Sequence, residues 1–181
     1  MKYTYYLVFL LFISGCSSNS GNTTFDLDRN NLKSSPNLGV NVTPRFSSAL
    51  PSSTKMIFYF KSNEVRYDMF NNWAQTPQDL LARHFMLYFN NPEKQIEKTA
   101  IENCILSGTI YDFECDTNSK EAIFTVEITI SDQNENLLMS KLYTSRANLE
   151  KLTASDFSIA MSLAVNKAAK LIYQDIQNLK K

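Results

Sequence analysis

The residue with the clearest chemical signal is Cys16, because its thiol stands in a distinctive setting. Residues 5–13 before it are almost wholly apolar, and the small residues Ser14 and Gly15 directly precede it. A thiol is a nucleophile, and small neighbours let an extended backbone enter a peptidase. Three interpretations follow from residue type alone: a buried thiol, one half of a disulfide, or an attachment point for another group.

The apolar run favours the third interpretation. A helix that spans a bilayer needs about 20 apolar residues, so this shorter N-terminal run predicts a signal peptide. Residues Ile13, Ser14, Gly15 and Cys16 resemble the bacterial lipobox, in which cleavage precedes a cysteine that receives a diacylglyceryl group. We therefore expect lipidation at Cys16, and Ser17 favours sorting to the periplasmic side of the outer membrane over the inner membrane. The alternative is an ordinary secretory peptide with an incidental cysteine.

This interpretation divides the chain into three parts. Residues 1–15 form the signal peptide, residues 16–23 form a lipidated polar tether, and residues 24–181 form one domain. Several acyl chains give stable attachment, since one chain binds a membrane only marginally. A tether of this length reaches at most about 25 Å, so we expect the domain to lie close to its membrane.

The rest of the chain offers little that could catalyse a reaction. His84, the single histidine, is expected to be an ordinary histidine of a helix face. The sequence has no nucleophile elbow, P-loop or glycine-rich dinucleotide turn, and its metal-ligand spacing fits no zinc site. We therefore predict a protein that is not an enzyme and that binds no metal or cofactor.

Two further cysteines, Cys104 and Cys115, stand eleven residues apart. On one continuous strand their Cα atoms would be about 36 Å apart, whereas a disulfide needs roughly 4.4–6.8 Å. A bridge would require a hairpin near Thr109-Ile110, which are poor turn residues. The sequence favours two unpaired, buried thiols.

Trp73 stands just before an expected helix. It is interpreted as a core residue at a strand-to-helix corner. Tryptophan is also enriched at interfaces, so Trp73 is the candidate partner-binding residue.

Composition and periodicity predict one α+β domain. The 181 residues carry 18 basic and 18 acidic side chains, which gives no basic footprint for nucleic acid. The alternation of apolar residues predicts strands and the helical stripes predict helices. We expect strands at 24–28, 37–44, 55–60, 64–70, 103–115, 120–131 and 137–147, and helices beginning at Thr76 and Thr153. Residues 45–53 read as a connection. The expected architecture is a mostly antiparallel sheet with two packed helices.

Three local features of these elements need an explanation from the structure. In the strand at 103–115 the apolar residues change parity, which indicates a bulge or coverage on both faces. Asp175 interrupts the apolar stripe of the last helix, and the sequence does not explain it. Ile159 and Leu163 fall on the far side of that helix and are candidates for a second contact.

Taken in order, several segments resemble the ABC-type transport auxiliary lipoprotein family, the PqiC-like lipoproteins. These are the lipobox, the segment "TFDLD" at 24–28, "NNWAQTPQDLLARHF" at 71–85, "LSGTIYDFE" at 106–114 and the alanine-rich last helix. Residues 45–55 depart from the family pattern, since only Leu50-Pro51 remains of its Leu-Pro-x-Tyr-Leu segment.

The resemblance implies an accessory lipoprotein rather than an enzyme. Its partners would be a substrate-binding protein of the MCE type and the components of an ABC transporter that moves lipid between the inner and outer membranes. The resemblance also allows a homo-oligomer. The alternative is an outer-membrane lipoprotein that regulates a cell-wall synthase or braces a secretion complex.

Overall fold

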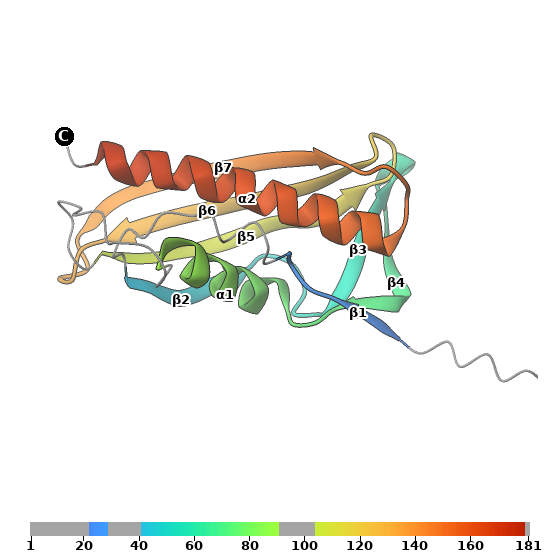
Figure 1. Cartoon of the computed structure of the whole chain (residues 1–181), viewed down its shortest axis with the longest axis horizontal. Coiled ribbons are helices and arrows are strands. Elements are labelled where there is room, and N and C mark those ends of the chain that lie inside the picture. The colour runs from blue at the N-terminus through green and yellow to red at the C-terminus, as the bar shows by residue number, and fades with distance from the viewer. Residues whose placement is uncertain (1–21, 29–40, 91–103, 180–181) are drawn as a thin grey trace, which may run out of the picture.

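The computed structural model describes residues 22–28, 41–90 and 104–179. Its strands form one seven-stranded sheet, and two helices cover one face of this sheet (Figure 1). The elements in chain order are β1 (Thr23–Phe25), β2 (Asn41–Ser48), β3 (Lys55–Phe60), a 3-10 turn (Lys61–Asn63), β4 (Glu64–Trp73), α1 (Pro77–Phe89), β5 (Ile105–Asp116), β6 (Glu121–Ser131), β7 (Leu137–Asn148) and α2 (Ala154–Asn178).

The sheet is mixed, so the prediction of a mostly antiparallel sheet was wrong. Among the described strands, β1 pairs with β4, β2 with β5 and β3 with β5 in parallel, whereas β3–β4, β5–β6 and β6–β7 pair antiparallel. The physical reason is connectivity. A short turn joins antiparallel neighbours, whereas parallel neighbours need a long crossover, and α1 lies in the crossover that leads to β5.

Two strands share one edge of β5, end to end. β2 pairs along Ile105 to Ile110, and β3 pairs along Glu114 to Asp116. Between the two stretches the register of β5 against β6 shifts at Ile110/Asp112. The predicted change of parity is therefore a β-bulge, and it keeps apolar side chains of both halves of β5 facing the helices.

The predicted end of the second strand at Pro44 was also wrong, because β2 continues to Ser48 through residues assigned to a connection. Proline cannot donate a ladder hydrogen bond, and it is tolerated on edge strands and at irregularities. Among the described strands β2 pairs with β5 alone, and its register shifts between Asn41 and Arg45. Both conditions are met at Pro44.

The two helices begin where the sequence predicts but are capped differently. At α2, the backbone N–H of Asp156 donates to the Thr153 hydroxyl at 3.1 Å, which is a true N-cap bond. At α1, Thr76 makes no such bond, and its hydroxyl donates to the Asp79 carboxylate instead. Pro77 at the first position of α1 supplies a backbone preset for the helix.

The core lies between the sheet and the helices. The alternating apolar residues of β6 are fully buried there: Ala122, Phe124, Val126, Ile128 and Ile130. From α2, Phe157, Met161, Ala164, Val165, Ala168 and Ile172 are also fully buried. Leu171 and Leu179 were predicted on this stripe but are 46 % and 37 % exposed.

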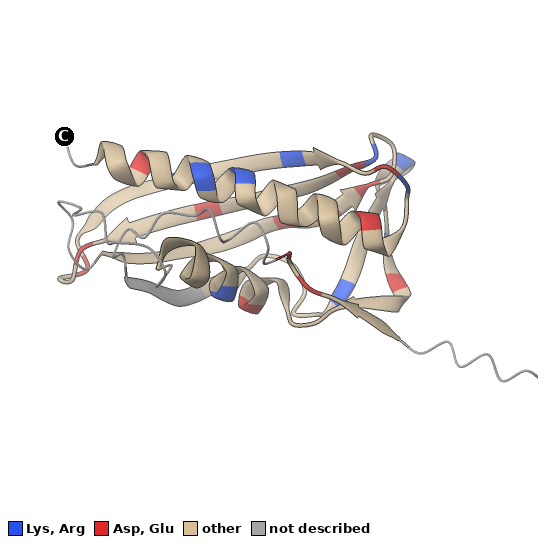
Figure 2. Ribbon diagram, viewed as in Figure 1, with Lys and Arg blue, Asp and Glu red and all other residues tan. Residues whose placement is uncertain are grey.

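Charged residues of both signs are interspersed over the visible side of the described elements (Figure 2). Within the described residues, no helix is both long and apolar enough to span a membrane.

Candidate functional site

The predicted lipobox, Ile13, Ser14, Gly15 and Cys16, lies outside the described residues. The structure shows where the chain that follows it joins the fold. β1 pairs in parallel with the end of β4, with Thr23 opposite Asn71 and Phe25 opposite Trp73. The first described strand, β1, therefore lies at the outer edge of the sheet (Figure 1).

Residues 26–28 fasten this entry point to both helices. The Arg83 guanidinium of α1 pairs with the Asp26 carboxylate. The backbone N–H of Asp28 donates to the Ser162 hydroxyl of α2 at 2.8 Å. Between them Leu27 is only 3 % exposed. Residues 23–28 are thus tied to the sheet and to both helices.

His84 lies between the helices rather than on an open helix face. It is 3 % exposed, and its Nε2 lies 2.9 Å from Oδ1 of Asn166 on α2. Burial lowers the pKa of His84 to about 4, although the Asn166 bond opposes this shift. The ring is neutral at pH 7 and serves to join the two helices.

Cys104 and Cys115 are both free and buried, as predicted. Burial raises the pKa of the Cys104 thiol, and burial together with Asp116 and Glu114 raises that of Cys115 to about 12. A thiol is reactive as its thiolate. Neither group has the properties of a nucleophile.

Trp73 packs in the core and is only 1 % exposed. Its ring contacts Phe113 with centroids 5.1 Å apart and Phe157 with centroids 5.4 Å apart. The side chain therefore presents no surface to a partner, and it ties β4 to β5 and α2.

The helix-free face of the sheet carries carboxylates beside apolar side chains, such as Leu142, which lies opposite Glu127. Three carboxylates follow one another along β5 at Asp112, Glu114 and Asp116, and burial together with the two neighbouring charges raises the pKa of Glu114. On β6, the Glu127 carboxylate accepts from Tyr111 and Ser140. Within the described residues, no cluster of three histidine, cysteine or acidic side chains has an arrangement that could hold a metal.

The sequence prediction missed a second surface, which lies within β4. Lys55 is opposite Asn72 and Ile57 is opposite Tyr67. Between these pairs β3 has one residue, Met56, whereas β4 has four, residues 68–71. We call residues 68–71 the β4 bulge. Two of its apolar side chains, Met69 and Phe70, are 75 % and 57 % exposed.

Polar bonds hold the β4 bulge in place. Oδ1 of Asp68 accepts from the backbone N–H groups of Phe70 and Asn71, each at 2.9 Å, and Oδ2 accepts from the Asn71 amide. Burial alone would raise the pKa of Asp68, but these bonds lower it. Lys55 Nζ also donates to the Met69 carbonyl at 3.2 Å. The sequence signal was an aspartate three residues before an asparagine, inside an apolar strand.

The structure also explains Asp175. Its carboxylate accepts from the Tyr143 hydroxyl and from Lys141 Nζ on β7, each at 2.7 Å. These bonds lower the pKa of Asp175. The interruption in the apolar stripe is a polar tie between α2 and the sheet.

No family model matches the chain, and no curated protein matches it significantly. Two solved structures share its fold. The first is protein XCC0632 from Xanthomonas campestris, of the family DUF330, which is 13 % identical with a TM-score of 0.66 over 90 % of this chain and 89 % of that one. The second, an uncharacterised protein, is 10 % identical with a TM-score of 0.65 over 86 % of this chain and 99 % of that one. The chain thus has the fold of a DUF330 protein.

Proposed function

We propose that this protein is a non-enzymatic lipoprotein anchored through Cys16 on the periplasmic side of the outer membrane. In this role it serves as an accessory subunit of an MCE-type ABC lipid-transport system. The observation that carries the proposal is the way in which β1 and residues 26–28 are held against the fold. β1 begins seven positions after the predicted lipid, and it is fastened to the sheet and, through Asp26 and Asp28, to both helices.

Three further observations support the proposal. The fold is that of a DUF330 protein. The segments at 24–28, 71–85 and 106–114 resemble the transport auxiliary lipoproteins. Two buried groups suited to chemistry are in unreactive settings, since His84 is neutral and bonded to Asn166, and burial raises the pKa of Cys115.

The proposal is tested by crosslinking in living cells followed by mass spectrometry. The wild-type chain should be crosslinked to an MCE protein or to its transporter subunits. The Cys16→Ala variant should lose the crosslinks that form at the outer membrane, because without cleavage and lipidation it would not be delivered there. A matched Cys104→Ala variant should keep them.

Two results would count against the transport role. Repeated recovery of no MCE protein from wild-type cells would contradict it. Reproducible crosslinks to a peptidoglycan synthase or to a secretion complex would instead favour the other kind of outer-membrane lipoprotein.

A further inference from the structure

The β4 bulge exposes two neighbouring apolar side chains at a fixed position. Successive residues of a regular strand point to opposite faces, so a regular strand would turn one of two neighbouring side chains toward the helices. Here Met69 and Phe70 are both more than half exposed, and Asp68 and Lys55 hold the backbone that carries them. The pair is therefore presented outward by a rigid support.

The bulge lies beside the point where the predicted anchor enters the fold. β1 and β4 run in parallel, and Thr23, the first residue of β1, lies opposite Asn71 of the β4 bulge. The start of β1 is therefore beside the bulge. Seven residue steps separate Cys16 from Thr23, and fully extended they span at most about 25 Å. If Cys16 carries lipid, this end of the protein stays close to the bilayer.

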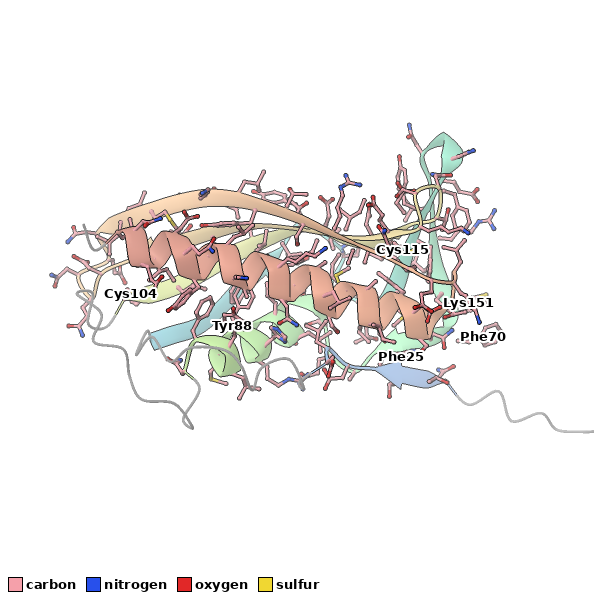
Figure 3. The ribbon with its side chains drawn as sticks, turned by 45° about the horizontal axis from the view of Figure 1, so that its top comes forward. Phe25, Phe70, Tyr88, Cys104, Cys115 and Lys151 are labelled. Carbon is pink, nitrogen blue, oxygen red and sulfur yellow. The ribbon has the colours of Figure 1, made fainter. Side chains whose placement is uncertain are left out.

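Another exposed chain segment shares this end. Figure 3 shows Phe70 and Lys151 at the end of the molecule where β1 begins. Lys151 is exposed, and Leu152 after it is 47 % exposed. Glu150 before Lys151 is also exposed, so the feature of this end that suits a lipid surface is its exposed apolar side chains, Met69, Phe70 and Leu152.

We propose that Met69 and Phe70 of the β4 bulge insert into the lipid surface of the membrane to which Cys16 is anchored. The occupant of this surface is thus the bilayer itself, and the contact sets the orientation of the domain on it. This inference rests on the proposed function in one respect, the lipid on Cys16.

The test uses the mature, lipidated protein that begins at Cys16, in vesicles of phosphatidylethanolamine and phosphatidylglycerol whose acyl chains are brominated. Bromine quenches tryptophan fluorescence on contact. Phe70→Trp and Met69→Trp are the reporters, and Leu142→Trp is the control, because Leu142 is 58 % exposed on β7 at the other edge of the sheet. The native Trp73 gives a constant background, since it is buried.

Emission from position 70 or 69 should be lost in brominated vesicles relative to unbrominated ones, and emission from position 142 should not change. Equal emission with and without bromine at positions 69 and 70, in protein that floats with the vesicles, would contradict the membrane contact of the bulge. It would leave the lipid anchor at Cys16 intact. Equal quenching at all three positions would also contradict the membrane contact of the bulge. Protein that does not float with the vesicles and lacks lipid at Cys16 would overturn the anchor, and this inference with it.

Discussion

His84 donates to Asn166 across the boundary between α1 and α2, and its pKa is lowered to about 4 by burial. An unfolded histidine titrates near pH 6.5. Between these values the unfolded chain binds more protons than the folded one, so stability rises with pH across this window. The stability that depends on a neutral His84 is fully present above pH 6.5 and is lost as the pH falls toward 4.

We therefore expect the free energy of unfolding to fall by about 2 kcal/mol between pH 7 and pH 4.5 on account of His84. Urea titrations of the wild type and of His84→Gln at both pH values measure this term. The variant should show a smaller dependence, because glutamine does not titrate. Parallel pH dependences in the two proteins would show that His84 does not carry the term.

Asp175 joins α2 to β7 through its bonds to Tyr143 and Lys141. Tyr143→Phe and Asp175→Asn should each lower the free energy of unfolding by about 1 kcal/mol, since each weakens a bond to a charged carboxylate. The double variant should cost less than the sum of the two, because both changes affect the same interaction. Denaturant titration of all four proteins gives the coupling. Additive costs would contradict a direct tie between Tyr143 and Asp175.

At the scale of elements, Gly108 decides how closely β5 approaches its neighbours. A Cβ at this position would lie 2.5 Å from the backbone oxygen of Glu127, 3.0 Å from Phe46 and 3.1 Å from Ile128. The backbone oxygen cannot move aside as the end of a flexible side chain could. Glycine is needed here for space.

Gly108→Ala should destabilise the protein by about 2 kcal/mol, within the range for overpacked interiors. Ser107→Ala is the matched control on the same strand, and it should change stability much less, because Ser107 faces away from the helices. Thermal or urea unfolding distinguishes the two variants. Equal costs would show that the contact at position 108 is relieved by small movements.

The elements themselves were largely predictable, but their neighbours in the sheet were not. The alternation in β6 fixed its buried face, and the parity change in β5 revealed a bulge. Alternation says which side chains share a face, and it carries no information about which strand lies alongside or in which direction. The parallel pairing of β3 with β5 depends on how α1 crosses the sheet, which is a property of tertiary packing.

For the candidate site residues, burial was predictable from the sequence, but the exposed bulge was not predicted. Residue types indicated that Trp73, Cys104 and Cys115 would be buried, because large apolar groups and thiols favour the interior. The β4 bulge was missed, because the apolar residues Met69 and Phe70 fit a strand pattern as well as an exposed loop. The spacing of Asp68 and Asn71 was the one sequence signal for the bulge, and the register of β3 against β4 shows that it forms.

At the scale of the whole molecule, residues 26–28 join the predicted tether to the folded body. Ser162→Ala removes the side chain that accepts from the Asp28 N–H. We expect hydrogen exchange at this amide to become roughly five- to tenfold faster, which corresponds to about 1 kcal/mol. Ser140→Ala, on the opposite face of the sheet, should leave it unchanged. Unaltered exchange in Ser162→Ala would show that other contacts suffice to hold the segment.

The proposed membrane anchor and the proposed membrane contact of the β4 bulge both depend on lipid at Cys16. The most direct measurement is mass spectrometry of the mature protein extracted from membranes. The account predicts a chain that begins at Cys16, with acyl groups on its N-terminal peptide and labelled palmitate incorporated in wild type but not in Cys16→Ala. A wild-type chain that keeps Met1, or one cleaved elsewhere and free of label, would contradict it.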